Sequence, residues 1–154
     1  MRRRRSGVLG VISDTHGLCR PEALAALAGV DRILHGGDVG SAEVLTWLRR
    51  VAPVTAVRGN NDRGAWARSL APQAAVRVGR HRILILHDRN ELSFAPESRG
   101  FTVVVAGHSH RPAIEELDGV LYVNPGSAGP RRFRLPVSLA LLHLSGERVD
   151  ADVV

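Results

Sequence analysis

The chain of 154 residues contains no lysine, a single cysteine (Cys19) and no apolar run long enough to cross a membrane. The lone Cys19 excludes an internal disulfide and fits a reducing compartment, where a small loop residue is favoured over a reactive thiol. The apolar segment 8–12 follows an arginine run but is too short for a secretory signal, since Asp14 interrupts it. We therefore expect a cytoplasmic protein without membrane contact.

The basic residues are all arginine, 21 against 15 acidic residues, which gives a formal net charge of +6. Positive charge favours anionic partners but does not say which, so nucleic acid, a phosphorylated metabolite and a phosphoprotein stay open. The run Arg2–Arg5 could form a nucleic-acid-binding arm, but no aromatic residue lies between its arginines to stack on bases. We interpret residues 1–6 as a disordered tail of one domain that spans residues 1–154.

The first half of the chain alternates predicted strands and helices. Short apolar segments predict strands at residues 8–12, 31–34 and 54–57. One helix is predicted from Pro21, which suits an early helical position, to Gly29. A second begins at the capping residue Ser41 and carries an apolar stripe of Val44, Leu45 and Leu48. Such alternation is typical of a parallel sheet with right-handed crossovers.

The second half predicts antiparallel hairpins instead. Apolar segments flank turn signals in three places, residues 75–86 around Gly79–His81, 113–123 around Asp118–Gly119, and 137–153 around Ser145–Glu147. Only Glu91–Ser98 leaves room for a short helix, and Trp47 and Trp66 are expected in the core. The sequence therefore predicts an α/β protein whose parallel and antiparallel halves pack around one core.

Side chains that can hold a metal follow five apolar segments, where each segment ends. They are Asp14 and His16, then Asp38, Asn60, His87, and finally His108 with His110. In an open α/β sheet, ligands bind beyond the carboxyl ends of the strands, so these donors should gather on one rim. Carboxylate, imidazole and amide donors together are typical of a site for two divalent cations.

Each motif alone has a structural explanation, and the strength of these explanations differs. Asp14–His16 and Gly36–Asp38 could be ordinary turns, and Gly59–Asp62 could equally be a turn or a helix cap. Two imidazoles two residues apart after a buried strand have few structural uses, so His108 and His110 favour metal. We expect supporting or structural roles for other polar residues, with His35 and Asp88 beside the ligands, His81 in a hairpin turn and His143 in a strand. Coincidence does not explain all five strand ends together.

The order Asp-x-His, Gly-Asp, Gly-Asn-x-Asp, His and Gly-His-x-His resembles the calcineurin-like metallophosphoesterase superfamily. Within it, the chain looks like the small bacterial and archaeal phosphodiesterases of the YfcE/MJ0936 type, and Asn124–Ser127 strengthens that placement. The resemblance extends from Gly7 to about Leu144. It implies a four-layer α-β-β-α sandwich of two mixed sheets.

The resemblance also implies two metal ions and a division of the ligands between them. One ion would take Asp14, His16, Asp38 and His110, and the other would take Asp38, Asn60, His87 and His108, with Asp38 bridging. A hydroxide between the ions would attack phosphorus in line with the leaving oxygen. Family habit favours Mn²⁺, while Ni²⁺, Fe, Co²⁺ and Zn²⁺ stay open.

Two positions depart from the family pattern. Asn61 stands where larger members carry His and small members often carry Cys, and an amide can donate to phosphate but cannot act as a general acid. Hydrolysis should therefore require a good leaving group. Asp88–Arg89 follows His87, where the family often has Gly-His. The weak candidates for catalysis are Asn61 and Asp62, and those for substrate binding are Asn61 and Arg20.

The sequence therefore predicts a metal-dependent phosphodiesterase that acts on a small phosphodiester or a nucleotide. Two alternatives share the fold, a phosphomonoesterase of the same mechanism and a protein-interaction scaffold such as the retromer subunit. The complete ligand set favours an enzyme over a scaffold. A nucleic-acid-binding module is the weakest interpretation, and the sequence leaves a homo-oligomer open.

Overall fold

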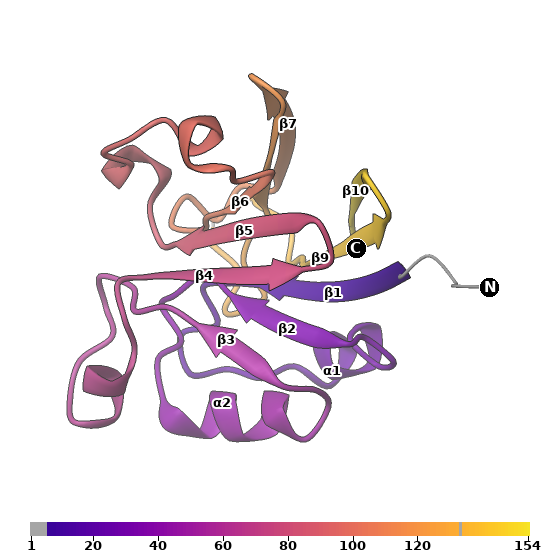
Figure 1. Ribbon diagram of the computed structural model, residues 1–154. Coiled ribbons are helices and arrows are strands. Elements are labelled where there is room, and N and C mark those ends of the chain that lie inside the picture. Colours follow the sequence, from indigo (N-terminus) through magenta and orange to yellow (C-terminus); the bar gives the residue numbers. More distant parts are fainter. Residues whose placement is uncertain (1–5, 133) are drawn as a thin grey trace.

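The computed structural model describes residues 6–132 and 134–154, and it forms two five-stranded sheets stacked face to face (Figure 1). The Arg2–Arg5 run lies outside the described residues. Ser6 opens the first strand and pairs with Ser145, so the predicted tail can extend no further than residue 5. Within the described ranges, no helix is long and apolar enough to span a bilayer.

The first sheet has the strand order β10–β9–β1–β2–β3. Its strands are β1 (Ser6–Ile12), β2 (Arg32–His35), β3 (Val54–Ala56), β9 (Ala140–Ser145) and β10 (Arg148–Val153). β1 runs parallel to β2 and antiparallel to β9, so the sheet is mixed. The C-terminal hairpin was predicted correctly, but it joins the N-terminal strands rather than a separate antiparallel half. That part of the sequence prediction was wrong, because pairing partners this far apart in the chain leave no local signal.

Helices α1 (Pro21–Ala26) and α2 (Ala42–Arg49) cover the outer face of this sheet (Figure 1). Pro21 occupies the start of α1 as predicted, because its missing N–H is not needed there. The predicted stripe of α2 is buried, with Val44 and Leu48 fully covered. Trp47 lies beside Leu48 in the sequence, and the helical turn carries it to the solvent side, where it is 37% exposed. Its predicted core position was wrong, whereas Trp66 packs partly buried against the α1–α2 layer.

The second sheet has the order β4–β5–β6–β8–β7. Its strands are β4 (Gln73–Val78), β5 (His81–Leu86), β6 (Val103–Val105), β7 (Ala113–Leu117) and β8 (Val120–Asn124). β5, β6 and β8 are parallel in the centre, and β4 and β7 pair antiparallel at the two edges. The predicted turn at Asp118–Gly119 is confirmed, with both residues at positive φ.

Three apolar layers replace the single core that the sequence predicted. One lies between the sheets and includes Leu34, Ile83 and Val105, and another lies between the first sheet and its helices. The third covers the outer face of the second sheet, where the segment containing the 3₁₀ turns η2 (Arg89–Glu91) and η3 (Pro96–Arg99) packs through Phe94 and Phe101. Another turn, η1 (Trp66–Ser69), leads into β4. The helix predicted at Glu91–Ser98 is thus two short turns, since Pro96 begins a new turn rather than continuing one.

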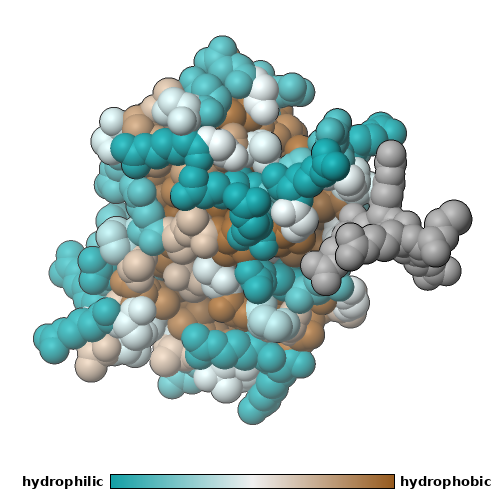
Figure 2. All heavy atoms as spheres, in the orientation of Figure 1, coloured by the Kyte–Doolittle hydropathy of each residue, from teal (hydrophilic) through white to brown (hydrophobic). Residues whose placement is uncertain are grey.

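The layers form the expected four-layer sandwich, but the fourth layer is thin. On the face seen in Figure 2, hydrophilic side chains are spread over the surface with apolar atoms visible between them. The thin outer layer leaves part of the second sheet accessible next to the loops that follow β5 and β6.

Candidate metal centre

Loops from both sheets meet at one edge of the sandwich. Those after β1, β2 and β3 come from the first sheet, and those after β5 and β6 come from the second. Backbone hydrogen bonds join them, including Asp14 N–H to Gly37 O (3.0 Å) and Gly107 N–H to His87 O (2.9 Å). The sequence predicted one rim of an open sheet, whereas two stacked sheets each contribute a part of it.

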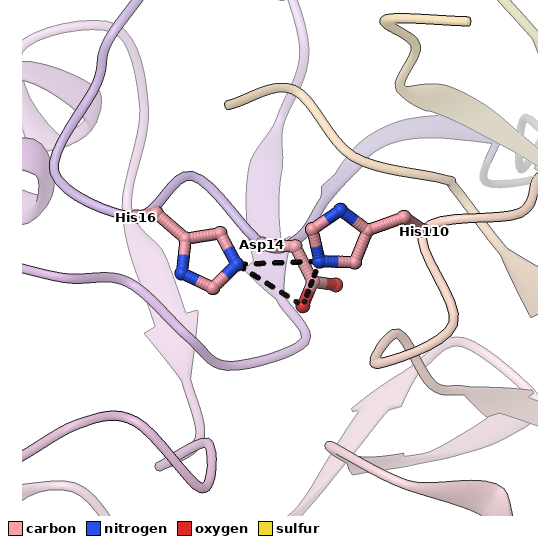
Figure 3. Close-up of side chains that lie close together, drawn as sticks. All are labelled: Asp14, His16 and His110. Atoms are coloured by element: carbon pink, nitrogen blue, oxygen red, sulfur yellow. Dashed lines mark hydrogen bonds and ion pairs between the residues drawn. The ribbon is translucent and has the colours of Figure 1, made fainter. Parts of the chain in front are cut away.

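Asp14, His16 and His110 form the first donor group (Figure 3). The Nε2 atoms of His16 and His110 are 3.2 Å apart. Asp14 Oδ1 lies 3.8 Å from the first of these atoms and 3.4 Å from the second. Asp14 Oδ1 is buried and has no hydrogen-bond partner among the described residues. Its other oxygen accepts hydrogen bonds from Ser13 Oγ (2.7 Å) and His108 N–H (3.0 Å), which fixes the carboxylate.

Asp14, Asp38 and His87 form the second donor group, which therefore shares Asp14 with the first, and His108 adjoins it through His87. Asp38 Oδ2 lies 3.3 Å from His87 Nε2, which in turn lies 3.3 Å from His108 Nδ1. The groups adjoin, since Asp38 Oδ2 is also 3.8 Å from His16 Nε2 and Asp14 Oδ1 is 3.9 Å from His87 Nε2. His87 is buried, whereas the His108 side chain is 45% exposed and forms the open side of the centre.

The donors fit divalent cations. Ligand atoms that share a cation at about 2.1 Å lie about 3.0–3.4 Å apart at tetrahedral or octahedral angles, which is close to the separations found here. Two imidazole nitrogens that face each other at 3.2 Å beside an unpartnered carboxylate oxygen direct several lone pairs at one point. Burying that oxygen without a partner is unfavourable unless a cation or a proton compensates it.

Backbone strain is concentrated at these residues. Outside glycine, positive φ occurs in the described residues at Asp14, His16, Asp38, His108, His110 and Asp118. Asp118 lies in the β7–β8 turn, so the other five are all predicted metal ligands. Each such conformation costs about 1 kcal/mol or more and is typical of functional sites. The fold therefore holds these donors in a backbone conformation that residues other than glycine disfavour.

Two glycines allow the loops to approach the carboxylates closely. A Cβ on Gly59 would overlap the backbone N and Oδ1 of Asp38, and one on Gly107 would overlap Ser13 Oγ and Asp14 Oδ2. Both positions need glycine for space, which explains why glycine precedes each of these two motifs.

Asp38 and His87 carry opposite charges in the metal-free protein. Burial opposes ionisation of Asp38, but hydrogen bonds from His87 and from the N–H of Asn61 outweigh it and lower the pKa of this carboxyl below its ordinary value. Burial also opposes protonation of His87, but its hydrogen bonds to Asp38 and Gly36 O raise its pKa to about 9. His87 Nδ1 donates to Gly36 O at 2.8 Å, so the ring presents Nε2 to the centre.

The pKa values of Asp14 and His110 shift in directions opposite to those of Asp38 and His87. Burial raises the pKa of Asp14, although Ser13 and the neighbouring imidazoles oppose this shift. Burial lowers the pKa of His110, and the Arg132 guanidinium lowers it further while Asp14 opposes it. A neutral His110 beside a carboxylate offers a lone pair to a cation.

The Gly59–Asp62 loop divides its residues between two tasks. Asn61 donates its backbone N–H to Asp38 Oδ1 (2.8 Å) and its amide to Asp38 Oδ2 (3.0 Å). Asp62 is buried and accepts the N–H groups of Gly59, Val39 and Gly40, so it ties this loop to the loop after β2. Asn60 is exposed on the same loop.

The remaining predicted residues take supporting positions. Arg20 donates two hydrogen bonds to Gly129 O, at 3.3 and 3.2 Å. His35 is fully buried, accepts the Gly37 N–H and bonds Thr15 Oγ1, so it links the first two loops. Asp88 approaches His108 Nε2 at 3.8 Å rather than His87, which it was expected to orient. His81 begins β5 and bonds Thr102 and Gly146 O, and His143 pairs with Asp152.

Sequence reasoning missed three groups that support the centre. Ser13 fixes Asp14, Ser127 Oγ donates to Asp14 O (2.9 Å), and Asn124 donates to Gly107 O (3.1 Å) and Ser109 Oγ (3.0 Å). Asn124 therefore holds the loop that carries His108 and His110. The Asn124–Ser127 motif carries part of the family resemblance, but its contacts reach the loop after the neighbouring strand β6 and, from Ser127, the loop after β1, and such contacts have no local signal.

Comparison with known families gives a match over most of the chain. A model described as the calcineurin-like phosphoesterase superfamily domain matches residues 8–147. A protein of Methanothermobacter thermautotrophicus named a probable metallophosphoesterase is 35% identical over 160 residues, covering 96% of this chain and 91% of that protein. Phosphodiesterase MJ0936 of Methanocaldococcus jannaschii is 28% identical over 137 residues, with 77% and 82% covered.

Solved structures share the fold. One described as a novel archaeal phosphodiesterase has a TM-score of 0.79 and 25% identity, covering 96% of this chain and 99% of that chain. Vacuolar protein sorting 29 of Cryptosporidium parvum has the same TM-score at 19% identity, with 97% of each chain covered, and this likeness shows the fold alone.

Proposed function

Because the chain belongs to the calcineurin-like phosphoesterase superfamily and is a phosphoester hydrolase, we propose that it is a phosphodiesterase with a dinuclear metal centre. Seven residues would hold the two cations in the division that the resemblance implies, namely Asp14, His16, Asp38, Asn60, His87, His108 and His110. The substrate would be a small phosphodiester or a nucleotide.

One observation carries the proposal. Six of the seven residues converge from two sheets, with facing imidazole nitrogens 3.2 Å and 3.3 Å apart, and the buried Asp14 Oδ1 beside them has no hydrogen-bond partner among the described residues. The seventh, Asn60, lies next to Asn61, which contacts Asp38. A scaffold that only binds partners has no need to maintain five strained donor residues at one point.

Hydrogen bonds and charges within the protein position the two carboxylates for metal binding. Asp38 is ionised, and its Oδ2 lies 3.3 Å from His87 Nε2 and 3.8 Å from His16 Nε2, so we assign it the bridging position. Ser13 and the His108 N–H hold one oxygen of Asp14 and leave the other free for a ligand bond. Two divalent cations, for which we favour Mn²⁺, would supply Lewis acidity and the hydroxide that in-line hydrolysis requires. Ni²⁺, Fe, Co²⁺ and Zn²⁺ also suit this donor set.

Asn61 would turn from Asp38 to a phosphoryl oxygen, since its amide can donate to either. Asp62 is fully engaged with three backbone N–H groups, so we assign it to loop positioning rather than to the chemistry. An amide cannot protonate a leaving alkoxide, and good leaving groups are therefore favoured. A phosphomonoesterase would use the same residues, and the named phosphodiesterase relative favours the diesterase.

The test is hydrolysis of bis-p-nitrophenyl phosphate by metal-stripped protein, with and without Mn²⁺. Mn²⁺-dependent turnover should occur in the wild type, disappear in Asp38→Ala and persist in Asp150→Ala, which removes an exposed carboxylate on β10. p-Nitrophenyl phosphate, assayed in parallel, distinguishes a monoesterase from a diesterase. Absence of turnover with every divalent metal tried would contradict the proposal and favour a binding role.

A further inference from the structure

A cavity of about 280 Å³ opens beside His108 on the outer face of the second sheet. Val104, Ala106 and Tyr122, which belong to the outermost apolar layer, form its floor. The cavity exists because the fourth layer is thin there, with only the η2 turn on one side and β7 on the other. We refer to it as the outer-face cavity.

One wall of the cavity is a stacked pair of planar groups. The Arg89 guanidinium lies over the Tyr122 ring, 4.0 Å from its centroid, and its Nη1 is 3.4 Å from Glu115 Oε2. Tyr122 and Glu115 thus hold the guanidinium plane in one orientation. The Arg89 side chain is still 42% exposed, so the guanidinium keeps surface that can stack on a second planar group.

The rim adds polar groups and a positive charge. Asn90, Ser109 and Arg111 line the cavity. Among the ion pairs of the described residues, none involves Arg111, and its side chain is exposed. His108 is shared between this cavity and the metal centre, so a phosphate at the centre would lie next to the cavity opening.

We propose that the outer-face cavity binds the nucleoside of a nucleotide substrate whose phosphate lies at the metal centre. The base would stack on the Arg89 guanidinium, and Arg111 and Asn90 would donate hydrogen bonds to acceptor atoms of the base. A volume of about 280 Å³ lies just below the range of about 300–1,000 Å³ of small-molecule pockets, which suits one nucleoside rather than a longer chain. This inference rests on the proposed function, since it needs a phosphate at the metal centre.

Calorimetry of the Mn²⁺-loaded protein with AMP and with inorganic phosphate tests the proposal without requiring turnover. Both ligands carry a phosphate dianion, so the ratio of their dissociation constants isolates the nucleoside. Wild type should bind AMP about tenfold more tightly than phosphate, a factor within the usual range for stacking of one base. Ribose 5-phosphate should resemble phosphate, because it lacks the base.

Arg89→Ala should reduce the preference for AMP to about twofold or less without changing the affinity for phosphate, and Arg111→Ala should reduce it partly. Arg49→Ala removes the same charge from the exposed side of α2 and should leave both affinities unchanged. Equal affinities in the wild type, or an unchanged preference in Arg89→Ala, would overturn the inference. If the protein prefers AMP but does not hydrolyse bis-p-nitrophenyl phosphate, the assignment of the cavity stands and the proposed function is wrong. If it hydrolyses the diester but does not prefer AMP, the proposed function stands and the assignment of the cavity is wrong.

Discussion

At the scale of residues, burial changes the protonation of side chains in and around the candidate centre. His35 is a clear case outside the proposed ligands. It is fully buried, and burial, followed by the nearby His87, lowers its pKa to about 3. A neutral ring with a protonated Nε2 satisfies all its contacts, because Nδ1 accepts the Gly37 N–H and Thr15 passes its own hydrogen on to Val39 O.

His35 should make the metal-free protein sensitive to acid. Its folded pKa of about 3 lies below the ordinary value of 6.5, so below pH 6.5 the unfolded chain takes up a proton that the folded protein does not. The free energy of unfolding should therefore fall by up to about 1.4 kcal/mol per pH unit between pH 6.5 and 3 from this residue alone. His35→Asn keeps an acceptor for Gly37 N–H and should lose stability less steeply. Urea unfolding in EDTA at several pH values measures both slopes, and equal slopes would contradict the assignment.

Asn61 should make the rate depend strongly on the leaving group. Because its amide cannot act as a general acid, we expect kcat/KM to fall steeply as the pKa of the leaving alcohol rises across aryl and alkyl phosphodiesters. Asn61→His should flatten this dependence and raise the rate for alkyl esters by at least about tenfold. Asn61→Gln keeps an amide and should not. A flat dependence in the wild type would mean that another group protonates the leaving oxygen.

At the scale of elements, the centre is an assembly of loops that few contacts hold in register. Asp62 accepts N–H groups from both the loop after β2 and the loop after β3. Asn124, at the end of β8, holds the loop after β6. The strands determine where each loop begins, and these side chains determine the path that the loop follows.

Asp62→Ala should therefore destabilise the fold by about 3 kcal/mol, because it leaves three N–H groups without their charged acceptor. The exposed control Asp150→Ala should change the free energy of unfolding by less than about 0.5 kcal/mol. Chemical denaturation of the metal-free proteins measures both. Calorimetry should also show weaker Mn²⁺ binding in Asp62→Ala, because Asn60 and Asn61 lose their anchor. An effect no larger than that of the control would show that the loops are held by other contacts.

At the scale of the whole molecule, the proposed ligands come from both sheets, which also meet through apolar packing and through hydrogen bonds such as His87 Nδ1–H to Gly36 O. Asp14, His16, Asp38 and Asn60 come from the first sheet, and His87, His108 and His110 come from the second. A cation shared by these residues binds only when both sheets are in place, so binding is coupled to folding.

Metal should therefore stabilise the entire fold. At a free Mn²⁺ concentration about 100 times the dissociation constant, the free energy of unfolding should rise by about 2.7 kcal/mol for each site. Thermal unfolding should shift to higher temperature with Mn²⁺ and return with EDTA, and Asp38→Ala should show no shift. A wild-type transition that does not respond to any divalent metal would contradict a centre that joins the sheets.

The sequence by itself determined the local features. Hydrophobic periodicity and turn residues located both helices and nearly all strands, and the strand ends identified the residues that the structure brings together. Short-range chemistry is sufficient here, because a strand boundary, a Pro at a helix start or an Asp-Gly turn depends on a few adjacent residues. Trp47 shows the limit of this approach, since a large apolar residue is compatible with either side of α2.

Only the tertiary structure decided how these pieces combine. The pairing of β9 with β1, the division of the ligands between two sheets and the roles of Ser13, Asp62 and Asn124 all depend on contacts between distant segments. The cavity beside His108 likewise arises from the thinness of one layer, which no motif encodes. Such contacts are set by packing of the complete chain, because the residues that meet are far apart in sequence and each would be stable with other neighbours.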